Sequence, residues 1–316
     1  MKGKTYPEII AADAAGIARA AEVLRRGGLV AVPTETVYGL AARADSAEAV
    51  AGIYRAKGRP DFNPLIVHVP GLAEAEAVAL LDQRARLLAD SFWPGALTLV
   101  LPQRQDAPLA AAVTAGLPTV ALRCPAHPAM RQLLAEAKLP LAAPSANRSG
   151  GVSPTTALHV AASLGDKVDL ILDGGACVAG IESTIVALRS DGGWQVLRPG
   201  PVTESQISGV LGEAPSVMTS LGTIEAPGQL ASHYAPGKPM RLGVEQAHEN
   251  EFHIGFGPFA GDMNLSATGD LAEAAAQLYA ALHAGADSFK PAIAVAPVPH
   301  EGIGAAINDR LRRAAA

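Results

Sequence analysis

The chain has 316 residues, of which 49% are hydrophobic and 17% charged, and its formal net charge is −5. This length allows two domains, and the core must be built mainly from aliphatic side chains because aromatic residues make up only 4%. The acidic balance argues against a protein coated with basic surface for general nucleic-acid binding, although it leaves room for a local cationic cleft.

The cysteines and the N-terminal segment bear on the compartment. Cys124 and Cys177 lie far apart and form no CxxC pair, so we expect small buried thiols and find no support for a disulfide between them. The N-terminal segment lacks the apolar stretch of a signal peptide, and no apolar run reaches the roughly 18 residues of a membrane span. We therefore expect a soluble, cytoplasmic protein that does not associate with a membrane.

The first 210 residues alternate helical and strand patterns, which predicts an α/β domain over residues 8–210 with a mixed sheet. Helices are predicted at 13–28, at 45–58 with Asp45 or Ser46 as N-cap and Gly58 at the end, and at 153–165 with Ser153 as the capping residue before Pro154. Strands are predicted where β-branched residues gather, at 29–33, 65–69, 97–101, 119–123, 168–173, 183–188 and 194–198.

The rest of the chain predicts a linker and a second domain. Residues 211–238 are rich in Pro, Gly and small polar residues, which is typical of a linker. Strand patterns at 239–244, 251–257 and 291–298 and helical patterns at 270–285 and 302–315 then predict a small α/β domain over residues 239–316. A domain of this size is expected to pack on the first domain or on another chain.

No P-loop, dinucleotide-binding or metalloprotease fingerprint is present, but four polar stretches stand at the ends of predicted strands. In PTETVYGLAA (33–42), Thr34 and Thr36 could be turn residues or could face a ligand, since α/β folds bind ligands at strand ends. KGRPDFNPLIVHV (57–69) could simply end a helix and continue as a core strand. It also gathers four polar side chains that could bind an anion, namely Lys57, Arg59, Asn63 and His68.

The other two stretches combine hydroxyls, amides and arginines. APSANRSGGVSPT (143–155) carries Ser145, Asn147 and Ser153, which could form an ordinary capped loop or a cradle for phosphate or ribose oxygens. GIESTIV (180–186) brings Ser183 to a strand start. Arg123 and Arg198 each end a strand, where a guanidinium could pair with a carboxylate or phosphate or form a surface salt bridge. Taken together, the four stretches favour a ligand with several negative groups.

These motifs, in the order PTETVYGLAA, KGRP…NPLIVHV, VALRCP, APSANRSG and LRPG, resemble the YrdC-like domain of the threonylcarbamoyl-AMP synthase family. The segments LASHYAPGKP and GIGAAINDRLRRAA resemble the two-domain form of that family, so the likeness covers nearly the whole chain. The resemblance implies a twisted mixed sheet with a concave, cationic face and a small Rossmann-like C-terminal domain. It implies that L-threonine, bicarbonate and ATP give threonylcarbamoyl-AMP, pyrophosphate and water, for the N6-threonylcarbamoyladenosine (t6A37) modification of tRNA.

The resemblance also implies roles for individual residues. ATP phosphates and the bicarbonate-derived group would be held by Lys57, Arg59, Ser145 and Asn147. The nucleotide would contact Asn63, Thr119, Ser153, Arg198 and the lid residue Tyr234. Threonine would contact Thr34 or Thr36, His68, Arg123 and Ser183.

Mg²⁺ is expected with ATP, but no metal site borne by the chain can be named. The product would pass to a tRNA threonylcarbamoyl-transferring enzyme, and stable direct binding of nucleic acid is not expected. An RNA-binding module and a carbamoyltransferase that uses the same domain are the competing hypotheses.

Overall fold

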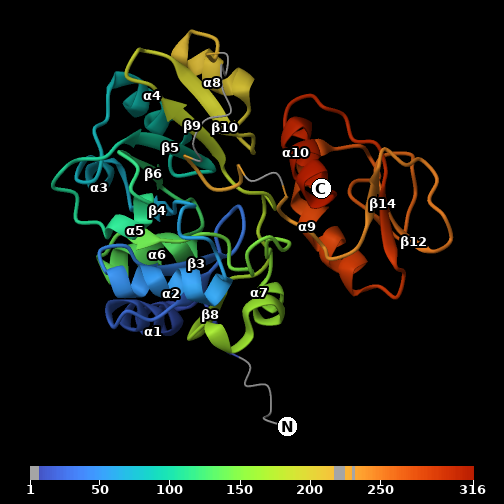
Figure 1. Ribbon diagram of the computed structural model, residues 1–316, viewed down its shortest axis with the longest axis horizontal. Coiled ribbons are helices and arrows are strands. Elements are labelled where there is room, and N and C mark those ends of the chain that lie inside the picture. The colour runs from blue at the N-terminus through green and yellow to red at the C-terminus, as the bar shows by residue number, and fades with distance from the viewer. Residues whose placement is uncertain (1–6, 217–224, 230–231) are drawn as a thin grey trace.

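A computed structural model describes residues 7–216, 225–229 and 232–316. It contains a larger α/β unit that carries the N-terminus and a smaller α/β unit that carries the C-terminus, side by side (Figure 1). The predicted linker, 211–238, includes residues 217–224 and 230–231, which lie outside the described residues. The prediction of two α/β units, the first with a mixed sheet, is confirmed.

The larger unit is built on a ten-stranded sheet with the order β1-β8-β2-β3-β7-β4-β6-β5-β9-β10. Its pairings are both parallel, as in β4 with β6, and antiparallel, as in β2 with β3. The strands are β1 Glu8–Ala11, β2 Val30–Val32, β3 Gly39–Arg43, β4 Ile66–His68, β5 Leu97–Pro102, β6 Thr119–Arg123, β7 Leu141–Ala142, β8 Leu170–Asp173, β9 Thr184–Leu188 and β10 Trp194–Arg198.

Helices cover both faces of this sheet. In β2, Ala31 belongs to one hydrophobic cluster while Val30 and Val32 belong to another, because successive side chains of a strand point to opposite faces. Residues of α2, α4 and α7 pack in the first cluster, and those of α1 and α6 in the second. The helical elements are α1 Ala14–Arg25, α2 Ala47–Lys57, α3 Leu72–Glu76, α4 Gln83–Phe92, α5 Ala111–Thr114, α6 Pro128–Ala137, α7 Ala157–Leu164, η1 Gly165–Lys167 and α8 Glu204–Leu211.

The helix boundaries test two of the capping predictions. Ser46 caps α2, where its side chain accepts a hydrogen bond from the backbone N–H of Ala49. The prediction that Ser153 caps the helix over 153–165 is wrong. The helix begins at Ala157, and its cap is Thr156, whose hydroxyl accepts from the backbone N–H of His159. The hydroxyl of Ser153 instead donates a hydrogen bond to Glu182, which is distant in sequence, so this hydroxyl does not cap the helix.

The smaller unit has a four-stranded sheet with the order β11-β14-β12-β13, and all three pairings are parallel. Its two helices, α9 and α10, lie on the side that faces the larger unit (Figure 1). The elements are β11 Met240–Leu242, β12 Glu251–Gly255, β13 Met263–Asn264, α9 Leu271–Asp287, β14 Ala292–Val295 and α10 Gly304–Ala314.

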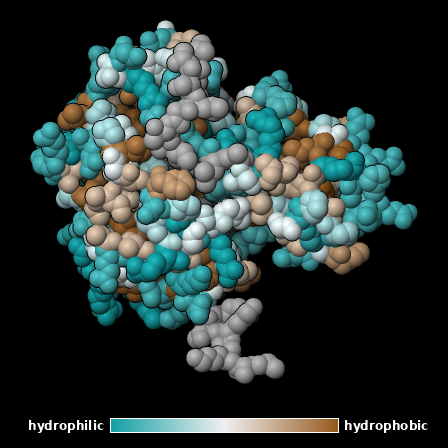
Figure 2. Space-filling model, in the orientation of Figure 1, coloured by the Kyte–Doolittle hydropathy of each residue, from teal (hydrophilic) through white to brown (hydrophobic). Residues whose placement is uncertain are grey.

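The two units share buried surface. Val37, Val152 and Ile181 of the larger unit pack in the hydrophobic cluster that forms the core of the smaller one. Hydrophilic residues are spread over the outer surfaces of both units in the view of Figure 2. Cys124 and Cys177 are both buried and free, as expected. Within the described part of the chain, no helix is both long and apolar enough to cross a membrane.

Candidate active site

A small cavity of about 40 Å³ lies between the ends of several strands of the large sheet and the segment that joins the two units. Strand register accounts for part of its wall, because His68 at the end of β4 pairs with Arg123 at the end of the parallel strand β6. Nine residues expected at a site line the cavity: Thr34, Thr36, Arg59, His68, Arg123, Ser145, Ser183, Arg198 and Tyr234. Four stretches far apart in the sequence therefore meet at one place.

Lys57 ends α2 and also supports the cavity wall. Gly58 caps the helix with a left-handed φ of 60°, so the predicted helix stop is confirmed. The Lys57 side chain is buried, and its Nζ donates to the backbone carbonyl oxygens of Ser145 and Asn147, each at 2.5 Å. Lys57 does not line the cavity itself, but it fixes the loop that presents Ser145.

Arg59 and Arg198 are buried guanidinium groups in the cavity wall. Arg59 donates to the carbonyl oxygens of Asn63, at 3.2 Å, and Pro64, at 2.9 Å. Arg198 donates to the carbonyl oxygen of Ser183 through Nε, at 3.1 Å, and Nη2, at 2.9 Å, and Nη2 also donates to the hydroxyl of Ser183, at 3.1 Å. Both side chains are thus held rigidly by backbone oxygens.

These three cations are not paired directly with a carboxylate, although Glu182 in the cavity wall acts on Lys57 and Arg198 from a longer distance. Lys57, Arg59 and Arg198 form no ion pair with a carboxylate among the residues that the structure describes. Burial and the neighbouring Arg59 lower the pKa of Lys57 well below its usual value, and burial lowers the pKa of Arg59 to about 10. Because Glu182 is paired with Arg310, the three cations keep positive charge that an anionic ligand would stabilise.

Arg123 sits at the centre of a more compact polar group. It donates to Glu35 Oε1 at 2.5 Å, to the hydroxyl of Thr36 at 2.8 Å and to the carbonyl oxygen of Gly95 at 3.1 Å. Burial disfavours the charged form of Glu35, but the charge of Arg123 and its hydrogen bond outweigh burial and hold the pKa of Glu35 below its usual value. Thr34 has a different task, since its hydroxyl accepts from the backbone N–H groups of Thr36 and Val37 and shapes the turn.

Several buried polar atoms at the site have no partner in the described part of the chain: Asn63 Oδ1, His68 Nδ1, Asn147 Oδ1 and His233 Nδ1. Burial lowers the pKa of both His68 and His233 to about 3, so both rings are neutral at physiological pH. Buried polar groups are normally hydrogen-bonded. Unpaired atoms in one neighbourhood therefore indicate that a polar ligand completes the site.

Five of the expected residues do not line the cavity, namely Lys57, Asn63, Thr119, Asn147 and Ser153, and two of these lie elsewhere for clear reasons. Thr119 begins β6, whereas Arg123 ends it, so about 13 Å of strand separates them. Ser153 is fully buried, but its hydroxyl is engaged by Glu182 Oε1 at 2.5 Å. Neither residue lines the cavity, and their expected contacts with the nucleotide stay predictions.

Comparison with known proteins assigns the family. A family model described as "Telomere recombination" matches residues 22–200, and one described as "Threonylcarbamoyl-AMP synthase, C-terminal domain" matches residues 202–316. The chain belongs to the threonylcarbamoyl-AMP synthase family. The resemblance noted from the motifs is confirmed, and the protein is a nucleotidyltransferase, an enzyme that forms threonylcarbamoyl-AMP.

Relatives of this synthase are similar over almost their whole length. The threonylcarbamoyl-AMP synthase of Bacillus subtilis is 40% identical, over 95% of this chain and 92% of the relative. That of Pyrococcus abyssi is 39% identical, over 93% of this chain and 92% of the relative. The crystal structure of P. abyssi Sua5 complexed with L-threonine superposes with a TM-score of 0.87 at 36% identity and covers 98% of this chain and 97% of that one.

Three residues of this synthase that the structure brings to the site or next to it had no predicted role, although Glu182 stands beside Ser183 in the motif GIESTIV. Glu182 and His233 line the cavity, although each is adjacent to a residue that was expected there. Arg310 lies behind the wall and bonds to Glu182. A signal for Arg310 existed, because helical periodicity puts this charged residue on the same face as Ala306, Ile307 and Ala314, and such a residue needs a buried partner.

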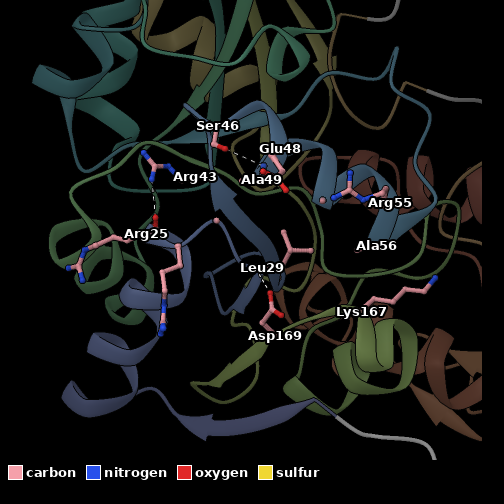
Figure 3. A pocket seen from close by; sticks show the side chains of 13 residues that line it. Arg25, Leu29, Arg43, Ser46, Glu48, Ala49, Arg55, Ala56, Lys167 and Asp169 are labelled. Atoms are coloured by element: carbon pink, nitrogen blue, oxygen red, sulfur yellow. Dashed lines mark hydrogen bonds between the residues drawn. The ribbon is translucent and has the colours of Figure 1, made fainter. Parts of the chain in front are cut away.

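A larger cavity of about 560 Å³ lies beside the outer surface of α2, between the end of α1 and η1 (Figure 3). None of the expected site residues lines it. Three of its arginines are in surface ion pairs, Arg25 with Glu136, Arg26 with Glu22 and Arg43 with Asp45. The charges that line the larger cavity are therefore largely balanced, in contrast to those of the smaller cavity. We place the site of the synthase in the smaller cavity because of its lining residues and not because of its volume.

Proposed function

We propose that the protein catalyses the ATP-dependent synthesis of threonylcarbamoyl-AMP and pyrophosphate from L-threonine and bicarbonate, at the cavity described above. The observation that carries this proposal is the group of three buried cations, Lys57, Arg59 and Arg198, held by backbone carbonyl oxygens with no carboxylate paired to them among the described residues. A polyphosphate supplies the missing negative charge, and a guanidinium fork suits phosphate oxygens.

The two sides of the cavity suit two substrates. On the sheet side, Arg123 would pair with the carboxylate of threonine, and His68 and Ser183 would contact the same substrate. We favour Thr36 over Thr34 for this contact because the Thr34 hydroxyl shapes the turn, while the Thr36 hydroxyl bonds to Arg123. The P. abyssi relative, whose structure is complexed with L-threonine, supports threonine as a ligand of this protein.

On the other side, the nucleotide would be bound by the cations and by the polar loop. Lys57 and Arg59, with Ser145 and Asn147, would hold the phosphates and the bicarbonate-derived group, and Arg198 and Tyr234 would contact the nucleotide. Contacts from Asn63, Thr119 and Ser153 are also proposed, and the unpaired Oδ1 atom of Asn63 is the best supported of the three.

The chemistry follows from these positions. The neutral amine of threonine attacks the carbon of bicarbonate or CO₂, an N–C bond forms, and a carbamate results. Water is released when bicarbonate is the donor, and a proton is released to solvent when CO₂ is the donor. A carbamate oxygen then attacks the α-phosphorus of ATP, and the bond to the β-phosphate breaks as pyrophosphate leaves. Positioning and fixed positive charge are the main contributions that a protein makes to such a step. Closure of the proposed lid over the substrates would exclude water, which would otherwise decompose the carbamate.

Mg²⁺ is expected to accompany ATP. Within the described ranges, no group of three or more His, Cys, Asp or Glu side chains could hold a metal ion. The two carboxylates nearest the cavity, Glu35 and Glu182, are engaged by arginines. The described residues therefore offer no cage for Mg²⁺, whose ligands would be the ATP phosphates and water.

The segment 211–238 would act as a lid between the catalytic domain, 8–210, and the C-terminal domain, 239–316, because Pro227, His233 and Tyr234 wall the cavity. We further propose that the site is the centre of a concave cationic face and that the small parallel-sheet unit is Rossmann-like. The product would pass in the cytoplasm to an enzyme that transfers the threonylcarbamoyl group to tRNA.

The competing hypotheses are less well supported. An RNA-binding module needs exposed cations, whereas the cations of the cavity are buried. A carbamoyltransferase that shares only the first domain does not account for relatives that match over both units.

Pyrophosphate release from ATP and bicarbonate tests the proposal, with L-threonine, L-serine and no amino acid compared. We expect release that depends on threonine, and at least about a 100-fold loss in Lys57→Ala, the range seen when a group that stabilises transition-state charge is removed. Arg55→Ala is the matched control, since Arg55 lies two residues earlier on α2 and is exposed. Pyrophosphate release that does not depend on threonine would contradict the proposal, and so would a Lys57→Ala variant that is folded and fully active.

A further inference from the structure

A buried ion pair joins the two units directly behind the cavity. Arg310 of α10 is 0% exposed, and its Nε donates to Glu182 Oε2 at 2.9 Å. Its Nη1 donates to Asp309 Oδ2 at 2.8 Å. Arg310 belongs to the small unit and Glu182 to the wall of the cavity in the large unit. The position of one side chain in the small unit is therefore coupled to the cavity wall.

Glu182 is the centre of a wider network. Its Oε1 accepts from the hydroxyl of Ser153 at 2.5 Å, and its Oε2 also accepts from the hydroxyl of Tyr279 in α9 at 2.7 Å. Burial would raise the pKa of Glu182, but the charges of Arg310 and Arg198 outweigh burial and lower the pKa to about 2. The carboxylate is thus ionised at neutral pH, and two of its three donors come from the small unit.

The same arginine contacts the segment that covers the cavity. The guanidinium carbon of Arg310 lies 5.4 Å from the centre of the Tyr234 ring, a cation–π contact, and the Tyr279 ring is 5.6 Å from that of Tyr234. Tyr234 has a φ of 65°, which is unfavourable for a residue with a bulky side chain. Surrounding contacts must hold it in this conformation, and Arg310 supplies one of them.

We propose that Arg310 is a positioning residue for the adenylation reaction. It contacts no reacting atom. It holds Glu182 and the ring of Tyr234 in place against the cavity, so that docking of the small unit shapes the nucleotide side of the site. The proposal rests on the proposed function, because it takes the cavity to be the ATP site.

Other contacts between the units do not account for this coupling. The rings of His159 and His283 stack with centroids 3.9 Å apart, and His283 Nε2 lies 3.1 Å from the carbonyl oxygen of Ser153. Neither histidine lines the cavity. These contacts help the units to dock, whereas Arg310 touches both the carboxylate and the ring that form the wall.

The kinetics of Arg310→Met test the proposal, with Arg312→Met as the matched control, an exposed arginine of the same helix. Loss of the buried partner of Glu182 is expected to raise the KM for ATP about tenfold or more, while the KM for threonine changes less than about twofold. Arg312→Met is expected to behave like the wild type. An unchanged KM for ATP, equal rises for both substrates, or an equal effect in Arg312→Met would overturn the proposal.

Two further variants keep the test decisive if Arg310→Met fails to fold. Tyr279→Phe removes only the hydroxyl bond to Glu182 and is expected to raise the KM for ATP about threefold, in line with the loss of one hydrogen bond to a charged group. Arg310→Lys keeps the positive charge and is expected to restore part of the lost ATP affinity. No change in Tyr279→Phe would contradict the proposal.

The wild-type result separates the two levels of inference. If wild-type protein releases pyrophosphate with threonine and the variants match it, only the role of Arg310 fails. If wild-type protein shows no threonine dependence, the proposed function fails. The dissociation constant of ATP, measured by calorimetry on wild type and Arg310→Met, then still reports whether Arg310 shapes the nucleotide site.

Discussion

At the scale of single residues, the site is marked by buried polar groups that have no carboxylate or hydrogen-bond partner among the described residues. Lys57, Arg59 and Arg198 are buried cations with carbonyl partners, and His68 and His233 are buried rings whose Nδ1 atoms find no partner among the described residues. Each arrangement costs folding free energy while the cavity holds no ligand. Under the proposed function, binding of ATP and threonine would recover this energy.

The cost of burying His68 can be measured from the pH dependence of the free energy of unfolding. Burial and the nearby Arg123 lower its folded-state pKa to about 3, whereas the unfolded value is near 6.5. Between pH 3 and pH 6.5, His68 therefore binds a proton more readily in the unfolded chain than in the folded protein. The contribution of neutral His68 to the free energy of unfolding is complete above pH 6.5 and is lost as the pH falls toward 3. The free energy of unfolding should decrease by up to about 1.4 kcal/mol per pH unit from this group.

Urea titrations at several pH values check this expectation. His68→Asn should show a smaller loss of stability than the wild type between pH 6.5 and pH 4, while the exposed His300→Asn variant should follow the wild type. Identical slopes for wild type and His68→Asn would show that His68 is not held neutral by its surroundings.

At the scale of elements, local rules predicted the parts of the fold that depend on neighbouring residues. The stop of α2 at Gly58 and the strands that end at His68 and Arg123 follow from capping and β-propensity. The hydroxyl of Ser153 before Pro154 predicts a helix cap, but Glu182, 29 residues later, accepts the hydrogen bond of that hydroxyl. The partner of Arg310 lies 128 residues away, so it could not be named from the sequence.

Gly180 of the large unit lies against α9 of the small unit, where there is no room for a side chain. Its φ is +68°, and a Cβ atom there would lie 2.5 Å from the carbonyl oxygen of Ala275 in α9. Gly180→Ala should therefore loosen the interface, which calorimetry would detect as separate unfolding of the small unit at a lower temperature. Gly116→Ala is the matched control, because its φ is +77° with no atom within 4 Å of the added Cβ.

Gly116→Ala carries the backbone strain of a left-handed alanine, about 1 kcal/mol, without the clash. It should lower the unfolding temperature slightly and leave a single transition. If Gly180→Ala behaves in the same way, the close approach of α9 is not what joins the units.

At the scale of the whole molecule, the site gathers three buried cations, Lys57, Arg59 and Arg198, in a protein whose net charge is −5. Because they are buried, their charge can act on a ligand over short distances in a medium of low dielectric constant. Pro227, His233 and Tyr234, from the segment between the two units, line the cavity. A lid formed by this segment, as proposed above, would move away from the strand ends before ATP enters.

The proposed lid predicts how ATP associates. The observed rate of binding, followed by stopped-flow fluorescence with a labelled ATP analogue, should rise with nucleotide concentration and then reach a plateau set by opening. Tyr234→Ala should raise the plateau, because it removes the ring that Arg310 and Tyr279 hold over the cavity. A rate that increases linearly to the highest concentration, with a slope near the upper end of the usual range of about 10⁵–10⁷ M⁻¹s⁻¹, would mean that the site is open in solution and that the lid closes only after ATP has bound.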